Sequence, residues 1–228
     1  MVTHLSLKKA QPESLYLDKL PPATARAFSY LVKSPLLKNT DWYLAGGTAL
    51  ALQVGHRKSV DLDFFLPRAE FDKTSLERSL AATKEWETTY QENGTLYGKL
   101  KGAKMSFIAY PFFKPSRAKV KYGNMRVLIP EDIAVMKIIA VSQRGRKRDF
   151  VDLYWYCRNR EPLVDIIRRT LGQYPGQEHN LPHIIKSLTY FDDADKDPMP
   201  QTYFEANWKT IKAFFKKEAR AIDAKLLK

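Results

Sequence analysis

Residues 46–65, GGTALALQVGHRKSVDLDFF, constrain the fold more than any other part of the chain. The apolar residues before Gly46 predict a strand, and the run after Gly47 predicts a helix start. The second apolar segment carries Asp61 and Asp63, and residues two apart on a strand point to the same face. The sequence therefore predicts a strand–turn–helix–strand unit in which both carboxylates project into one spot. The other residues of this second strand are expected to be buried: Val60, Leu62, Phe64 and Phe65.

The two aspartates of this strand predict a metal site. Two carboxylates this close repel each other and shift each other's protonation unless a cation lies between them. Mg²⁺ is bound in proteins by one or two carboxylates together with substrate phosphates, and Mn²⁺ accepts similar oxygen ligands. The first hypothesis is therefore phosphate chemistry at Mg²⁺ (or Mn²⁺) held by Asp61 and Asp63.

The glycine pair predicts an anion site beside the carboxylates. Backbone N–H groups at a helix N-terminus bind phosphate well when no side chains intervene, as at Gly46 and Gly47. Thr48 adds a hydroxyl donor or caps the helix, and Arg57 and Ser59 are further phosphate donors. A glycine pair alone is typical of many turns, but followed by D-x-D at this distance it indicates a site for a nucleoside triphosphate (NTP).

These motifs resemble the nucleotidyltransferase superfamily, in which a Gly-Gly or Gly-Ser turn precedes a strand with two carboxylates. The fuller string, with GHRKS before DLDFF, is similar to the AbiEii-type toxin branch, which belongs to abortive-infection and type IV toxin–antitoxin-like systems. We expect His56, which lies beside Arg57 in that string, to have a structural role or to lie next to the phosphates. Three later segments agree with the resemblance: DIAVMKIIA (132–140), RGRKRDFVDLYW (144–155) and YFDDAD (190–195). The resemblance covers about residues 40 to 195.

The pattern and the resemblance together predict an α+β fold. We expect a nucleotidyltransferase-like mixed sheet with flanking helices, followed by a helical C-terminal half. Strands are predicted over residues 95–100 and 104–110 and near 127–129, and helices over 13–39, 70–84 and from Pro130 onward. We assign residues 1–125 to the nucleotidyltransferase-like domain and 126–228 to a helical domain that completes the active-site cleft.

Lys137 lies in the helix that is expected to begin at Pro130. Ile133, Met136 and Ile139 have the spacing of a buried helix face, with Lys137 beside them. A lysine next to an apolar stripe usually extends its ammonium group to water. The resemblance implies the other interpretation, in which Lys137 reaches the phosphates of the nucleotide during transfer. Both interpretations remain open at this point.

Asp149 and Asp152 are three residues apart and share a face if the segment is helical. In one interpretation Arg148 pairs with Asp152 across a turn, or Asp149 caps the helix. The resemblance implies another, in which one aspartate faces Asp61 and Asp63 as part of the catalytic constellation. The basic residues around it then bind phosphate or RNA. We assign Asp152 to the active site, Asp149 to a structural or supporting role, and Arg148 to phosphate binding.

One feature of the wider superfamily is missing. Many such enzymes carry a third carboxylate on a later strand, where it acts as the base for the attacking hydroxyl. The matching strand here, 104–110, offers Ser106, and the sequence has no Asp or Glu between Glu92 and Glu131. Either a carboxylate of the helical half substitutes, or the chain uses two metal ligands without a strong base, or it has lost catalysis.

Composition narrows the partners. A net charge of +13 on 228 residues favours a polyanion such as RNA or DNA, although a basic surface without such a partner is the alternative. Cys157 is the single cysteine, so no intramolecular disulfide forms and a reducing compartment is expected. No apolar run approaches the ~18 residues of a membrane span, and the N-terminus lacks a hydrophobic signal core. We expect a cytoplasmic protein without a membrane partner.

The resemblance then implies a function. We expect a Mg-dependent nucleotidyltransferase that moves a nucleoside monophosphate from an NTP to an RNA acceptor, with a tRNA 3′ end as one candidate. It would act as the toxin-like component of a toxin–antitoxin system, with an antitoxin as protein partner. The alternatives are a nucleotidyltransferase that modifies a protein or a small molecule, and a non-catalytic RNA- or partner-binding module on the same fold.

Overall fold

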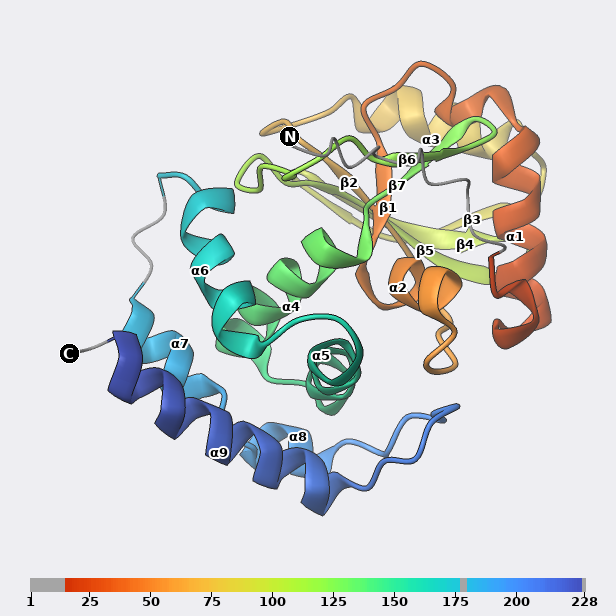
Figure 1. Ribbon diagram of the computed structural model, residues 1–228. Helices are drawn as coiled ribbons and strands as arrows, with labels where there is room; N and C mark the ends of the chain where they lie inside the picture. The colour runs from red at the N-terminus through yellow and green to blue at the C-terminus, as the bar shows by residue number, and fades with distance from the viewer. Residues whose placement is uncertain (1–14, 177–179, 227–228) are drawn as a thin grey trace, which may run out of the picture.

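A computed structural model describes residues 15–176 and 180–226, and its centre is a mixed sheet (Figure 1). In the described residues the sheet has seven strands in the order β3-β4-β5-β2-β1-β7-β6. The pairs β2–β5 and β1–β7 are parallel, and the other neighbours are antiparallel. The strands are β1 (Tyr43–Ala45), β2 (Leu62–Leu66), β3 (Trp86–Glu92), β4 (Thr95–Leu100), β5 (Ala103–Ala109), β6 (Val120–Tyr122) and β7 (Met125–Val127).

The strand predictions succeed where apolar residues dominate and fail at the edges. Strands β1, β2, β4 and β5 lie where the pattern predicts them, and β6 with β7 form a hairpin in place of one short strand. The edge strand β3 was not predicted, because its largely exposed residues show no buried face. The expected burial of Val60 is wrong: its exposed fraction is 46%, since β2 begins only at Leu62.

Helices α1 (Pro22–Lys33) and α3 (Lys73–Ala81) lie at the right and top of the sheet in Figure 1, away from the later helices. They pack on β5 and on β3 and β4, respectively, against the apolar face of the sheet. The predicted helix over 13–39 is instead α1 between two short 3₁₀ turns, η1 (Leu17–Lys19) and η2 (Pro35–Leu37), and residues 13 and 14 lie outside the described part.

The helical C-terminal half is confirmed. Its helices are α4 (Pro130–Arg144), α5 (Lys147–Asn159), α6 (Leu163–Gln173), α7 (Leu181–Ser187), α8 (Asp192–Lys196) and α9 (Trp208–Leu226). Helix α4 connects the two halves, because it packs on α2 (Gly46–Val54) of the sheet unit and on α5, α6 and α7. Phe150 of α5 contacts Phe191, Trp208 and Phe215, which fixes α8 and α9 on α5.

The division into two domains between residues 125 and 126 remains a prediction.

Across 15–176 and 180–226, none of the helices has both the length and the apolar character that crossing a bilayer requires.

Candidate active site

The turn between β1 and α2 needs glycine at two successive positions. Gly46 has φ of +72°, a region that favours glycine, and a Cβ atom there would lie 3.0 Å from Oδ2 of Asp63. A Cβ atom on Gly47 would lie only 2.2 Å from Nη2 of Arg57. The glycines therefore let a carboxylate and a guanidinium group approach the N-terminus of α2.

A cavity of about 740 Å³ opens beside this turn. Its walls come from the β1–α2 turn, the segment leading into β2, strands β4 and β5, helix α4 and the start of α5. Eight of the predicted site residues line it: Gly46, Gly47, Arg57, Ser59, Asp61, Asp63, Lys137 and Arg148. The fold thus brings the predicted phosphate and metal residues to one place, although Gly46 and Arg148 are 102 residues apart in the sequence.

Asp61 and Asp63 both line the cavity but differ in environment. Asp61 precedes β2, is partly exposed, and lies 3.5 Å from Nη1 of Arg148. Asp63 is inside the strand, and its Oδ1 accepts a 2.7 Å hydrogen bond from the hydroxyl of Ser106. Burial raises the pKa of Asp63, as does the charge of Asp61, and together they prevail over the lowering effect of the Ser106 hydrogen bond.

This donor set fits Mg²⁺ with few protein ligands. In the described part of the chain, no three or more His, Cys, Asp and Glu side chains gather as a metal-binding group. Asp61 and Asp63 supply two carboxylates to one cavity, and Mg²⁺ usually takes only one or two, completing its shell with phosphates and water. Ser106, which the sequence predicts in place of a third strand carboxylate, lies directly opposite Asp63 in the pairing of β2 with β5.

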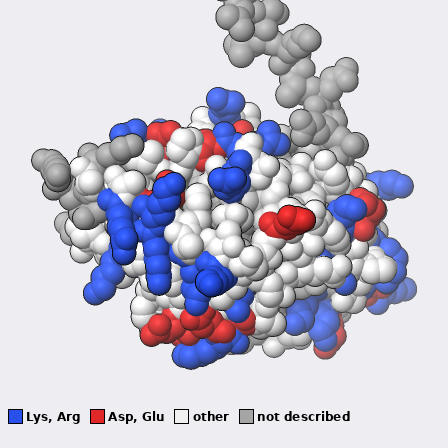
Figure 2. Space-filling view, turned by 60° about the horizontal axis from the view of Figure 1, so that its bottom comes forward, with Lys and Arg blue, Asp and Glu red and all other residues white. Residues whose placement is uncertain are grey.

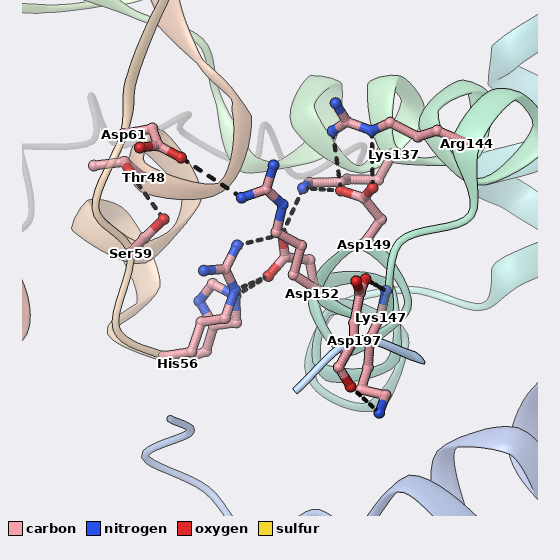
Figure 3. Close-up of polar contacts among 12 residues, drawn as sticks. Thr48, His56, Ser59, Asp61, Lys137, Arg144, Lys147, Asp149, Asp152 and Asp197 are labelled. Carbon is pink, nitrogen blue, oxygen red and sulfur yellow. Dashed lines mark hydrogen bonds and ion pairs between the residues drawn. The ribbon is translucent and has the colours of Figure 1, made fainter. Parts of the chain in front are cut away.

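Behind the cavity, Asp152 is fully buried and holds three basic groups (Figure 3). It accepts hydrogen bonds from Nε of Arg57 at 2.5 Å and Nη2 at 2.9 Å, and from Nε2 of His56 at 2.7 Å. The ammonium group of Lys137 lies 2.7 Å from Oδ2 of Asp152. Asp152 therefore fixes Arg57 and Lys137, which are two residues of the cavity wall. In the described structure, Asp152 itself does not line the cavity.

Asp149 completes this buried network. It accepts a hydrogen bond from Lys137 at 2.5 Å and from Nε of Arg144 at 3.2 Å, as Figure 3 shows. Lys137 is only 6% exposed and is held between Asp149 and Asp152. The interpretation in which Lys137 extends to water is therefore wrong, although Lys137 is one of the residues that line the cavity.

The pKa values of the two aspartates of this network lie below the ordinary value, so both carboxylates are ionised at neutral pH. Burial would raise the pKa of Asp152, but the charges of Arg57 and Lys137 and the hydrogen bonds from His56 and Arg57 hold it well below its usual range. The pKa of Asp149 is lowered in the same way by Lys137 and Arg144 against its burial. Burial lowers the pKa of His56, so its neutral ring donates through Nε2 to Asp152, while Nδ1 has no partner among the described atoms.

Three structural interpretations from the sequence need correction. Arg148 does not pair with Asp152, because it faces the cavity and contacts Asp61 instead. Asp149 does not cap α5, whose N-cap is Arg146. Thr48 neither caps α2 nor lines the cavity in the described structure; its buried hydroxyl donates to Ser59 at 2.9 Å and so supports a residue that does line it.

The sequence reasoning missed the part of the cavity that lies on β4 and β5. Tyr97, Lys99 and Lys104 line it together with Ser106. A signal was available, because Lys104 and Ser106 are two apart on a strand, as are Tyr97 and Lys99, and therefore share a face. Which strand would lie beside β5 was not readable from the same pattern.

Comparisons with known proteins show the family and the fold of the chain. The family model described as nucleotidyl transferase AbiEii toxin, type IV TA system, matches residues 30–101 and 120–227. An uncharacterized protein of Aquifex aeolicus (strain VF5) is 35% identical over 184 residues, which cover 79% of this chain and 87% of that protein.

Two solved structures have a similar fold. JHP933 from Helicobacter pylori has a TM-score of 0.54 at 19% identity and covers 89% of this chain and 91% of its own. The nucleotidyltransferase toxin MenT4 from Mycobacterium tuberculosis H37Rv has a TM-score of 0.51 at 14% identity, covering 89% of this chain and 85% of its own. At these identities the likeness concerns the fold.

Proposed function

The chain belongs to the AbiEii nucleotidyltransferase toxin family, and from that premise we propose that it transfers a nucleoside monophosphate from an NTP to RNA. The observation that carries the proposal is the cavity in which Asp61 and Asp63 lie beside the Gly46-Gly47 turn and several cations. This combination suits a triphosphate, because glycine amides and cations bind its oxygens while carboxylates bind its metal.

The basic residues of the cavity would hold the phosphates. Arg57, Lys137, Arg144 and Arg148 all line it. Two of them are rigid: Arg57 is 4% exposed and Lys137 is 6% exposed, and Asp152 contacts both. Fixed cations stabilise charge that develops in a reaction better than mobile ones, because they need no reorganisation. In this proposal Asp149 and Asp152 act by positioning the cations rather than by touching substrate.

The carboxylates would hold the divalent metal. Asp61 and Asp63 are the proposed ligands of Mg²⁺ or Mn²⁺, which when bound supplies charge stabilisation on the triphosphate. An acceptor hydroxyl oxygen would form a bond to the α-phosphorus and lose its proton to solvent, the bond from that phosphorus to the bridging oxygen would break, and pyrophosphate would leave. Catalysis would rest on positioning and electrostatics, because Ser106 stands where a carboxylate base would be expected.

RNA is the proposed acceptor because of the charge of the surface. The chain carries 38 Lys and Arg against 25 Asp and Glu. Figure 2 shows one face on which basic side chains are widespread and gather at the left, while acidic ones form smaller groups. An antitoxin protein is the proposed partner, since the family model is that of a type IV toxin. A cytoplasmic location is proposed on the same ground.

The test is transfer of a labelled nucleotide. Purified protein, Mg²⁺ and total tRNA are incubated with each of the four nucleoside triphosphates labelled at the α-phosphate. Asp63→Asn removes a proposed metal ligand, and Asp193→Asn makes the same exchange at an exposed position of α8 as a matched control. We expect label on RNA with the wild type and the control variant, and none with Asp63→Asn.

Other outcomes separate the alternatives. Label on added protein or on a small acceptor, and none on RNA, would favour a transferase with another acceptor. Binding of RNA without any transfer, unchanged in Asp63→Asn, would favour a non-catalytic module. Transfer that persists in Asp63→Asn would refute the assignment of Asp63 as a metal ligand.

A further inference from the structure

The residues that pair with Asp63 on successive strands form a row on one face of the sheet, and this row extends from the cavity to the edge strand β3. Asp63 pairs with Ser106 in β5, Ser106 pairs with Tyr97 in β4, and Tyr97 pairs with Tyr90 in β3. Residues directly opposite each other on paired strands project from the same face. These four side chains therefore form one row, with a carboxylate at one end and two tyrosines at the other.

The tyrosine end of this row is open to solvent. Tyr97 is 39% exposed and Tyr90 is 48% exposed, and their ring centroids lie 5.6 Å apart. Neighbouring strands are about 4.8 Å apart, so Tyr97 lies roughly 10 Å and Tyr90 roughly 14 Å from Asp63 across the sheet. Tyr97 also lines the cavity, so the exposed rings are continuous with the candidate active site.

Two lysines flank the tyrosines on the same face. Lys104 lies two residues before Ser106, and Lys99 lies two residues after Tyr97, and the two lysines pair across β4 and β5. Lys99 contacts Glu87 at 3.3 Å at the rim, whereas Lys104 has no carboxylate within ion-pair distance among the described residues. Both lysines line the cavity. We call Tyr90, Tyr97, Lys99 and Lys104 the tyrosine platform.

We propose that the tyrosine platform binds the single-stranded 3′ end of an RNA acceptor and leads its terminal hydroxyl to Asp63. This inference rests on the proposed function. Aromatic rings on which bases stack, combined with cations along the backbone path, are the usual means of holding single-stranded nucleic acid. Successive stacked nucleotides are about 3.4 Å apart along a strand, so the row has room for several of them before the reacting centre.

The contacts of the platform predict stacking without strong sequence preference. The hydroxyl of Tyr90 donates to Glu92 at 2.6 Å and is therefore already engaged. Its ring remains available, and every base has a face that stacks on it. The cavity wall also offers apolar residues outside the platform, among them Phe65 of β2 and Met136 and Ile139 of α4, as a surface for the base of the NTP.

The test measures RNA binding and NTP binding separately. The double variant Tyr90→Thr/Tyr97→Thr removes both rings but keeps residues that favour strands. The control Tyr190→Thr changes a tyrosine outside the platform that is 52% exposed. Dissociation constants are measured for a fluorescent single-stranded RNA, a blunt RNA duplex of the same sequence, and each NTP with Mg²⁺. Thermal unfolding checks that each variant is folded, and Tyr97→Phe tests whether the ring alone suffices.

We expect the double variant to bind single-stranded RNA about tenfold more weakly or worse, as for loss of one or more stacked bases. NTP binding should be unchanged, the control should match the wild type, and Tyr97→Phe should bind RNA as the wild type does. A change below twofold in RNA affinity overturns the inference. An equal loss of NTP binding also overturns it, and would assign the rings to the nucleotide base.

The outcomes also distinguish this inference from the proposed function. If the wild type binds RNA through the tyrosines but transfers no nucleotide, the proposed function fails and the platform stands. If the wild type labels RNA and the double variant does so with unchanged KM for RNA, the platform fails and the proposed function stands. Labelling of a protein acceptor that depends on the same tyrosines would replace RNA with protein as the occupant.

Discussion

Replacing Asp152 with asparagine tests the buried network most directly. Two buried cations, Arg57 and Lys137, face two buried carboxylates, Asp149 and Asp152, and His56 is neutral because burial lowers its pKa. Asp152→Asn keeps the size and one acceptor oxygen but leaves one buried positive charge without a partner. Removing one member of a buried ion pair costs about 3–5 kcal/mol. That is a large part of the 5–15 kcal/mol that typically separates folded and unfolded states.

The assay is equilibrium unfolding in urea at pH 7, with thermal unfolding as a second readout. For a chain of this size, each kcal/mol moves Tm by about 2–4 °C, so we expect Asp152→Asn to lower Tm by roughly 6–20 °C. Asp193→Asn, at an exposed ion pair with Lys196, serves as the matched control and should change the free energy of unfolding by less than about 1 kcal/mol.

A loss below about 1 kcal/mol in Asp152→Asn would refute this reasoning. It would mean that water or a rearranged side chain compensates Arg57 and Lys137, and hence that these cations are not held rigidly. A loss within the expected range, with transfer activity reduced at temperatures where the variant is fully folded, would support the positioning role of Asp152.

Three further predictions follow from the same structure. The pKa of Asp152 in the folded protein lies well below its ordinary value of 3.8, so its contribution to stability is fully present above that value and is lost as pH falls through the folded pKa. Urea unfolding between pH 5 and pH 2 should therefore show that the free energy of unfolding falls more steeply with acid in the wild type than in Asp152→Asn. Gly47→Ala places a Cβ atom 2.2 Å from Nη2 of Arg57 and should displace that side chain, which would lower both Tm and transfer. As a control, the Cβ atom of Gly172→Ala in α6 meets nothing within 4 Å, and this variant should raise the free energy of unfolding by about 0.5–1 kcal/mol. Equal effects of the two variants would contradict the close approach of Arg57 to Gly47. Chelation of divalent metal by EDTA should abolish transfer and excess Mg²⁺ should restore it, whereas transfer at full rate in EDTA would exclude a metal requirement.

Part of the site was readable from the sequence because it is local. The Gly46-Gly47 turn, the strand that follows α2 and the placement of both aspartates on one cavity depend on spacings of a few residues. Short-range sterics and the alternation of side chains along a strand determine such units. The edge strand β3 could not be predicted from the sequence pattern, because its exposed residues show no alternation of apolar and polar side chains.

The partners of the charged residues were not readable. The resemblance indicated that Lys137, Asp149 and Asp152 belong to the site, but their chemistry depends on which groups meet. Arg57 and Asp152 are 95 residues apart in sequence, and they pair because α5 packs on α2. That contact places Asp152, which the sequence assigned to the active site, in a buried position where it pairs with Arg57. It also leaves Arg148 free of Asp152 and close to Asp61.

The sequence by itself determined the family, the class of fold and the local unit that presents Asp61 and Asp63, because each depends on residue order over short distances. Only the tertiary structure decided how Lys137 is held and that Tyr97 and Tyr90 continue the row of Asp63 and Ser106. The physical reason is that strand register and helix docking arise from packing summed over the whole core. A side chain's neighbours in space therefore follow from that packing and not from its neighbours in the chain.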